Sequence, residues 1–295
     1  MRPIYEATVA HVDITHACHL SCANCTRFVG HHRSPQTMDL DEIRTAIRSY
    51  ATFPGRVGFM GGETTLHPKF REILAIVRDE IPDKDRREFW TAGWKWLDFV
   101  DDINDTFHPH LITYNDHTQE TGKHQPLLIA IDEVIDDKEL MWELIDECWI
   151  QKQWSPTVTS RGSFFCEVAA AQDHLFDGPG GWDPVDGWWD KTPDSPEFRE
   201  QVERYCVNCS ACIPMEAFPD GRGGRDGPTV DVVSPGNLER LLQAGSPKAR
   251  RGQVEVFTGK LTREDTAAVK EWKPSHFRDF EAWSPEDVER ATSDA

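Results

Sequence analysis

The stretch TVAHVDITHACHLSCANC, residues 8–25, decides the fold. Its first half, Thr8–Thr15, is rich in β-branched residues and alternates in part between apolar and polar positions, which predicts a strand. The strand runs straight into a loop with three cysteines spaced C-x3-C-x2-C: Cys18, Cys22 and Cys25. Three thiolates from one loop can hold three irons of a cubane cluster and leave the fourth iron open for a small molecule. This spacing suits a structural zinc poorly, although His16 or His19 could complete a zinc set.

Alternating strands and helices follow this loop. The expected strands are residues 8–15, 56–60, 88–92, 110–114 and 126–131, with a sixth near 157–165. The expected helices are residues 40–50, 70–81 and 137–151, where apolar residues recur at helical spacing. This order predicts an α/β fold with a partial (β/α) barrel of five or six parallel strands and a small, irregular, Cys-rich C-terminal extension.

A second motif, Gly61-Gly62-Glu63, ends the strand 56–60. Without Cβ atoms, the two glycines let a strand end approach a ligand closely, whereas a simple β-to-α turn is the alternative explanation. With this motif the sequence resembles the radical S-adenosylmethionine superfamily, which has C-x3-C-x2-C after the first strand of a partial barrel and a GGE element after the second. The resemblance covers about residues 8–215.

The resemblance implies a cofactor and its ligands. Cys18, Cys22 and Cys25 would hold a [4Fe–4S] cluster whose open iron chelates S-adenosylmethionine, and reductive cleavage would yield a 5′-deoxyadenosyl radical that abstracts a substrate hydrogen. The residues of Gly61-Gly62-Glu63 would cradle the methionyl ammonium. Many members place an aromatic residue just before the third cysteine, against the adenine; this chain has Asn24, which we expect to hydrogen-bond the adenine instead.

Five further cysteines lie downstream: Cys148, Cys166, Cys206, Cys209 and Cys212. Their pattern, with Gly162 four residues before Cys166, is similar to the twitch version of the SPASM extension. That similarity implies an auxiliary [4Fe–4S] cluster on Cys148, Cys166, Cys206 and Cys209, serving electron transfer or structure. Cys212 is then a spare thiol, either a hydrogen-atom donor at the radical site or a buried cysteine without a role. A zinc knuckle built on Cys206, Cys209 and Cys212 is the alternative.

The changes in composition along the chain predict three parts. Residues 1–147 form the barrel, residues 148–221 the auxiliary-cluster domain, and residues 222–295 a polar tail with short helices near 238–244 and 262–272, joined through the glycine-rich segment 221–224.

Four further residues are candidate substrate contacts: His31 and His32, which follow the cluster loop, and Asp132 and Glu133, which follow the strand 126–131. The carboxyl ends of barrel strands are where such folds place their sites, so these side chains could bind a substrate or accept a proton. A solvated loop and a helix-initiating acidic pair explain them equally well.

Composition narrows the classes of partner. With 32 Lys and Arg against 51 Asp and Glu, the net charge is −19, which disfavours extended nucleic-acid binding and anionic membranes. No apolar run approaches the roughly 20 residues of a membrane helix. The first residues show no export signal, so we expect a cytoplasmic protein with reduced cysteines.

Taken together, these features predict a radical S-adenosylmethionine oxidoreductase or isomerase that oxidises or epimerises a small polar substrate, such as a sugar or aminocyclitol. Its electrons would come from an external flavodoxin- or ferredoxin-like reductant. Two alternatives stay open: radical rearrangement of a modified pyrimidine nucleoside or nucleotide, and a zinc-stabilised binding module without enzymatic activity. Peptide modification ranks below these, because no leader-binding domain is recognised before Thr8.

Overall fold

A computed structural model describes residues 1–114, 124–153, 156–215 and 230–273. Its centre is a six-stranded sheet in the order β4-β3-β2-β1-β5-β6. All neighbouring strands pair in parallel except β5 and β6, which form an antiparallel hairpin. The strands are β1 (Val9–Thr15), β2 (Arg56–Gly61), β3 (Arg87–Thr91), β4 (Ile112–Tyr114), β5 (Thr157–Thr159) and β6 (Gly162–Phe164). The fold is therefore mixed α/β with a mostly parallel sheet, consistent with a partial barrel.

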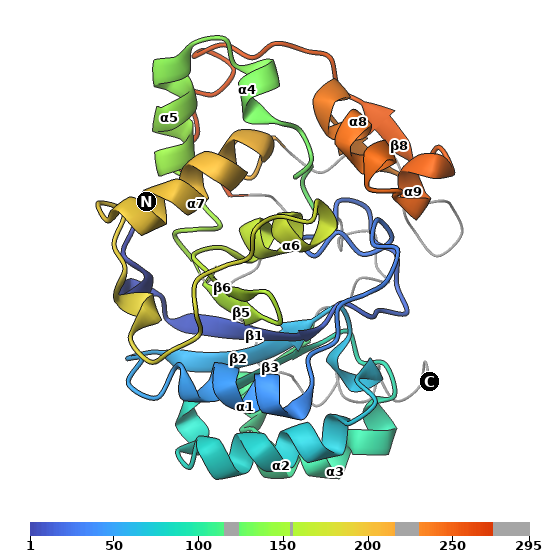
Figure 1. The fold of residues 1–295 in the computed structure, drawn as a ribbon, viewed down its shortest axis with the longest axis vertical. Helices are drawn as coiled ribbons and strands as arrows, with labels where there is room; N and C mark the ends of the chain where they lie inside the picture. Colours follow the sequence, from blue (N-terminus) through green and yellow to red (C-terminus); the bar gives the residue numbers. More distant parts are fainter. Residues whose placement is uncertain (115–123, 154–155, 216–229, 274–295) are drawn as a thin grey trace.

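Helices cover both faces of this sheet (Figure 1). On one face lie α1 (Leu40–Arg48), α2 (Phe70–Glu80) and α3 (Trp96–Thr106), and on the other lie α6 (Glu167–Leu175) and α7 (Pro196–Tyr205). The remaining α-helices are α4 (Ile131–Val134), α5 (Lys138–Asp146), α8 (Pro235–Gln243) and α9 (Pro247–Arg250). A second sheet pairs β7 (Asp231–Val233) with β8 (Val254–Val256). Short 3-10 helices span Ile4–Glu6, Thr64–Leu66, Lys84–Arg86, Pro109–Leu111, Trp188–Asp190 and Cys206–Asn208.

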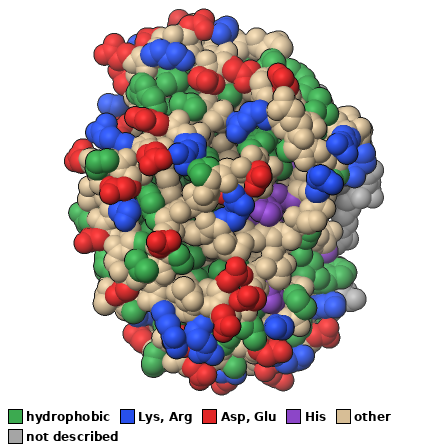
Figure 2. Space-filling view, viewed as in Figure 1, with side chains coloured by type: hydrophobic (Ala, Val, Ile, Leu, Met, Phe, Trp, Pro, Cys, Tyr) green, Lys and Arg blue, Asp and Glu red, His purple; other side chains and the backbone are tan. Residues whose placement is uncertain are grey.

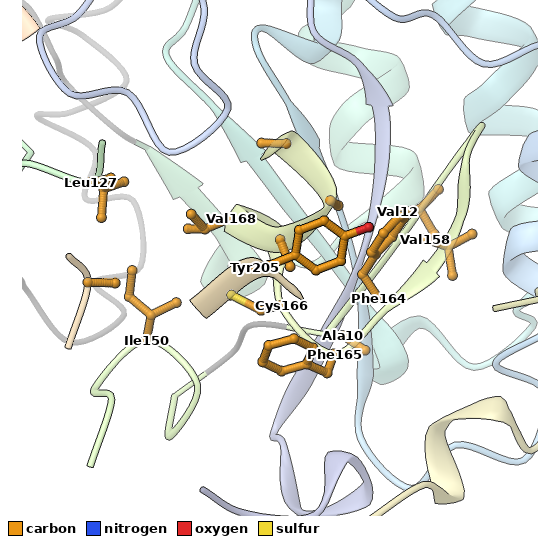
Figure 3. Packing of buried hydrophobic residues seen from close by; sticks show 14 of the residues in the cluster. Ala10, Val12, Leu127, Ile150, Val158, Phe164, Phe165, Cys166, Val168 and Tyr205 are labelled. Atoms are coloured by element: carbon orange, nitrogen blue, oxygen red, sulfur yellow. The ribbon is translucent and has the colours of Figure 1, made fainter. Parts of the chain in front are cut away.

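The hydrophobic core surrounds β1, which is buried along its whole length. Figure 3 shows Ala10 and Val12 of this strand near Val158 of β5 and Phe164 of β6, with Cys166 and Tyr205 close by. Burying this apolar surface stabilises the fold by roughly 25 cal/mol per Å² removed from water. The packing also fixes Cys166, at the start of α6, within the core.

Either Thr37 or Asp39 could cap the helix expected at 40–50, and the structure places Asp39 at the N-terminus of α1. Its carboxylate accepts hydrogen bonds from the backbone N–H groups of Asp41 and Glu42, while the Glu42 carboxylate accepts from the N–H of Asp39, which completes a capping box. We expect Asp39→Ala to lower the free energy of unfolding by about 1 kcal/mol, because it leaves two helix donors without a partner. Urea unfolding measures this loss, with Asp41→Ala as the control; an equal loss in both variants would contradict the capping role.

Two expected elements were wrong. The apolar run 126–131 is buried but is not a strand of the main sheet. Instead, its backbone accepts hydrogen bonds from Ser210 and Ser234, both far along the chain, and Leu128 bridges to Val233 of β7. Residues 263–271 form consecutive turns and no regular helix. A short apolar run has the same residue pattern whether it pairs in a sheet or lies extended in the core. Periodicity therefore could not separate the two structures.

The other expected elements are present, with ends shifted by a few residues. The stretch 157–165 became the hairpin β5–β6, of which only β5 continues the parallel order. The glycine-rich joint at 221–224 lies outside the described residues. Among the helices that the structure describes, none combines the length and the apolar character needed to cross a bilayer.

Candidate functional site

The first cysteine loop leaves the sheet at the carboxyl end of β1, beside the end of β2. There the N–H of Gly62 donates to the carbonyl of Thr15, and the N–H of Glu63 donates to that of Ala17, both at 2.7 Å. A Cβ at Gly61 would lie 2.1 Å from the Thr15 oxygen, and one at Gly62 would lie 2.4 Å from the Ala17 oxygen. The two glycines are therefore required here because two backbones come too close for any side chain.

Glu63 is completely buried, and its carboxylate is held on several sides. Oε1 accepts from the hydroxyls of Thr65 and Thr91, and Oε2 accepts from the N–H of Ala92. These bonds tie the end of β2 to the end of β3. The backbone contacts of the motif thus bring Glu63 beside the cysteine loop, while its side chain orders the neighbouring strand end. A contact between Glu63 and a ligand's ammonium stays a prediction.

The three thiols of this loop lie within electrostatic range of one another. Burial, together with the charges of Cys25 and Glu63, raises the pKa of Cys18 to about 12. Burial and the neighbouring thiols likewise raise the pKa of Cys22, and burial raises that of Cys25. Thiols that lie this close together lose their protons and become thiolates when they bind a cationic metal or cluster. The donor set therefore fits an iron–sulfur cluster.

Two cations oppose the negative charge of this loop. Lys248 of α9 is fully buried, donates to the carbonyl of Cys22 at 3.0 Å and lowers the pKa values of Cys22 and Cys25. Arg27 also lowers the pKa of Cys25. Sequence reasoning missed both residues. The sequence around Lys248 gives no signal for this role, because it belongs to the segment 222–295 that we expected to be a polar tail.

His31 and Lys248 share one carboxylate, that of Asp231 on β7. His31 Nε2–H donates to Oδ2 at 2.6 Å, and Lys248 Nζ donates to Oδ1 at 2.7 Å. Burial raises the pKa of Asp231, but the bonds from His31 and Lys248 outweigh it, so the net pKa is lowered. The other ring nitrogen of His31 lies 2.7 Å from Ser246 Oγ. Both nitrogens of His31 are thus engaged in holding β7 and α9 on the cysteine loop.

Asn24 belongs to the same junction. It has a left-handed backbone, with φ of 51°, and its N–H donates to Asp231 Oδ1 at 2.7 Å. Its side-chain amide donates to the carbonyl of His124 and accepts from the N–H of Val232. The amide thus fastens the loop to β7, and the expected contact with adenine stays a prediction.

The five downstream cysteines also come together. Cys148 follows α5, Cys166 precedes α6, and Cys206 ends α7, with Cys209 and Cys212 just beyond. Burial raises the pKa of each of them, and the charge of Cys148 contributes for the other four. Cys212 is within range of Cys148 and Cys209, so the structure does not separate a spare thiol from four ligands.

These cysteine groups are wider than a zinc site. Four sulfurs 2.3 Å from a tetrahedral zinc lie about 3.8 Å from one another. Within the described ranges, no three cysteines have ligand atoms mutually within 4.8 Å. For the downstream cysteines, an auxiliary cluster and a zinc knuckle both stay predictions.

A buried polar network lies beside the loop, on the face of β1 toward α6. Arg27 contacts Asp13 with Nε at 3.2 Å and Nη2 at 3.1 Å, and contacts Glu167 of α6 with Nη1 at 2.9 Å. His11 Nδ1 lies 3.4 Å from Glu167 Oε2. Neither ring nitrogen of His11 has a hydrogen-bond partner among the described residues, nor has Glu167 Oε2. Buried polar atoms of this kind are typical of sites that take a polar ligand or ordered water.

The four candidate substrate contacts lie in different parts of the structure. His32 lies with His16 and His174. Asp132 and Glu133 are in α4 and do not follow a strand, which corrects the basis on which we selected them. Glu133 accepts hydrogen bonds from Ser234 Oγ and the N–H of Gly236, so it caps the start of α8.

No family model and no curated protein matches this chain. Among solved structures the chain is similar to selenomethionine BtrN in an open conformation, at 14% identity and a TM-score of 0.41 over 68% of this chain and 86% of that one. It is also similar to BtrN in complex with AdoMet and 2-DOIA, at 15% identity and a TM-score of 0.41 over 68% and 88%. At this level of likeness the function has to be argued from this chain's own residues.

Proposed function

We propose that this protein is a radical S-adenosylmethionine enzyme that acts on a small polar substrate. The observation that carries the proposal is the meeting of Cys18, Cys22 and Cys25 with Gly61-Gly62-Glu63 at the carboxyl edge of the parallel sheet. The three thiolates would hold a [4Fe–4S] cluster, and that cluster, with an external flavodoxin- or ferredoxin-like reductant, supplies the electron for cleaving S-adenosylmethionine.

The chain's own residues prepare this site. Lys248 and Arg27 offset the thiolate charges, and Asp231 holds Lys248 in place through its carboxylate. β7 and α9 pack on the loop through Asp231 and Lys248, which contact Asn24 and Cys22. Glu63, through Thr91 and Ala92, keeps the ends of β2 and β3 at a fixed separation.

The polar network supports a substrate with hydroxyl or amino groups. His11 and Glu167 present buried polar atoms without hydrogen-bond partners within the described part of the chain, on the sheet face next to the cysteine loop. We place a sugar or aminocyclitol there, for oxidation or epimerisation. The second cysteine group supports oxidation, because an auxiliary [4Fe–4S] cluster there would accept the electron that oxidation releases. A modified pyrimidine nucleoside is the alternative substrate.

The test is S-adenosylmethionine cleavage by anaerobically reconstituted protein with dithionite. We expect 5′-deoxyadenosine, and deuterium from the attacked carbon of the true substrate should appear in it. Deuterated aminocyclitols, sugars and pyrimidine nucleosides, assayed in parallel, separate the substrate classes. The matched control is the same protein loaded with zinc in place of iron, which should form no 5′-deoxyadenosine. Iron-loaded protein that makes no more product than this control would overturn the proposal.

A further inference from the structure

Three histidines from distant parts of the chain meet beside the cysteine loop. His16 directly follows β1, His32 lies in the loop beyond Cys25, and His174 is on α6. Their ring centroids are 5.2 Å apart for His16 and His32, 5.5 Å for His16 and His174, and 4.7 Å for His32 and His174. One ligand atom of each lies within 4.8 Å of the others. No other three His, Cys, Asp or Glu residues in the described ranges meet this condition.

The cluster reaches the surface on one side. His16 is 2% exposed, whereas His32 and His174 are half-buried. Figure 2 shows histidine side chains together near the middle of the viewed face, with basic and acidic side chains around them. A small ion can therefore reach this place from solvent.

His16 has no hydrogen bond at either ring nitrogen within the described part of the chain. The nearest carboxylate atom, Asp13 Oδ2, is 3.8 Å from Nε2, which is too far for a hydrogen bond. A buried imidazole without partners costs about 1–3 kcal/mol. Packing contacts do not offset this free-energy cost, whereas a ligand bound by a ring nitrogen offsets it.

His32 and His174 are oriented as metal ligands usually are. Nε2–H of His32 donates to the carbonyl of Arg27 at 2.7 Å, and Nε2–H of His174 donates to that of Ser34 at 3.4 Å. Such bonds fix the tautomer and leave the second nitrogen of each neutral ring with its lone pair. Neutral imidazole is the form that binds metals.

From this geometry we infer that His16, His32 and His174 form a binding site for one divalent transition metal of the zinc class. An ion at the centre of a triangle with 4.8 Å sides lies about 2.8 Å from each corner, and zinc–nitrogen bonds are about 2.0–2.1 Å. Since 4.8 Å is the upper limit of these separations, an inward shift of each ligand atom by at most about 0.7 Å completes the site.

The site differs in kind from the two cysteine groups. Imidazole nitrogens suit Zn, Cu, Fe and Ni, and three protein ligands leave a coordination position open. Since the ligands include no thiol, the metal can be identified by its ligand atoms even when both cysteine groups carry iron.

The test is to add Zn²⁺ to protein whose iron has already been loaded, remove unbound metal, and count zinc and iron per chain. We expect about one zinc per chain without loss of iron. X-ray absorption at the zinc edge should show nitrogen at about 2.0–2.1 Å and no sulfur at 2.3 Å. Zinc bound through sulfur, or no retained zinc, would overturn the inference. S-adenosylmethionine cleavage is measured on the same samples, so failure of one proposal leaves the other standing.

The variants are His174→Gln and the double variant His32→Gln, His174→Gln. We expect the double variant to retain almost no zinc. The single variant should bind zinc at least tenfold more weakly, because a three-ligand site loses most of its affinity when one ligand is removed. The matched control is His110→Gln, an exposed histidine outside the cluster, which should keep about one zinc. Unchanged iron content shows that the variants remain folded. Equal zinc in the double variant and in the control would contradict the inference.

Discussion

Replacing Cys18, Cys22 and Cys25 together with alanine should abolish formation of 5′-deoxyadenosine and halve the iron content. Reconstituted wild-type protein is expected to hold about eight irons per chain, in two cubane clusters, and the triple variant about four. The physical reason is that these three thiols lie together in one loop, whereas the other five cysteines gather around Cys148. Iron and acid-labile sulfide analysis measures the change, and the absorbance near 400 nm should fall in proportion.

The matched control is the double variant Cys206→Ala, Cys209→Ala. It should lose the other four irons and keep the cluster that binds S-adenosylmethionine, so uncoupled cleavage should survive in it. The alternative outcome is a wild-type content of about four irons, none in the triple variant, and zinc in both proteins. That result would mean that the second cysteine group is a structural zinc site. The oxidation proposal would then lose its electron acceptor.

The strand, the cysteine loop and the first helices could be predicted from the sequence because each depends on neighbouring residues. Thr8–Thr15 has the composition of a strand, and apolar residues recur at helical spacing in 40–50 and 70–81, so the local pattern was sufficient. Likewise, the glycines at 61 and 62 stand where a strand end meets another backbone. Local rules therefore located the site's centre.

The surroundings of the loop could not be predicted in the same way. Asp231 and Lys248 reach Asn24 and Cys22 across more than 200 residues of sequence, and nothing in a polar tail marks them as partners of a buried loop. The same reason applies to His174, which meets His16 only because α6 packs over β1. Long-range pairing of this kind depends on the whole fold, so the roles of His31 and Asn24 became visible only in three dimensions.

The largest effect on stability is expected from Arg27→Met. Arg27 is the cation between two buried carboxylates, those of Asp13 and Glu167. Removing it leaves two like charges in the protein interior, and breaking a buried ion pair from one side costs about 3–5 kcal/mol. Urea unfolding measures the loss, with both proteins prepared without iron so that unfolding is not coupled to cluster release. Arg71→Met, which removes an exposed pair with Asp102, is the matched control and should cost less than about 1 kcal/mol.

The pH dependence of this effect follows from Asp13. Burial raises its pKa, but Arg27 and His16 outweigh burial, so the pKa of the folded protein lies below the unfolded value of about 3.9. The stability that ionised Asp13 contributes is therefore present above about pH 4 and is lost as the pH falls further. Without Arg27, burial dominates and folding favours the protonated acid, so the variant should lose its stability mainly as the pH rises. The difference between the two proteins should narrow steadily below pH 4, and a difference independent of pH would mean that Arg27 stabilises by packing alone.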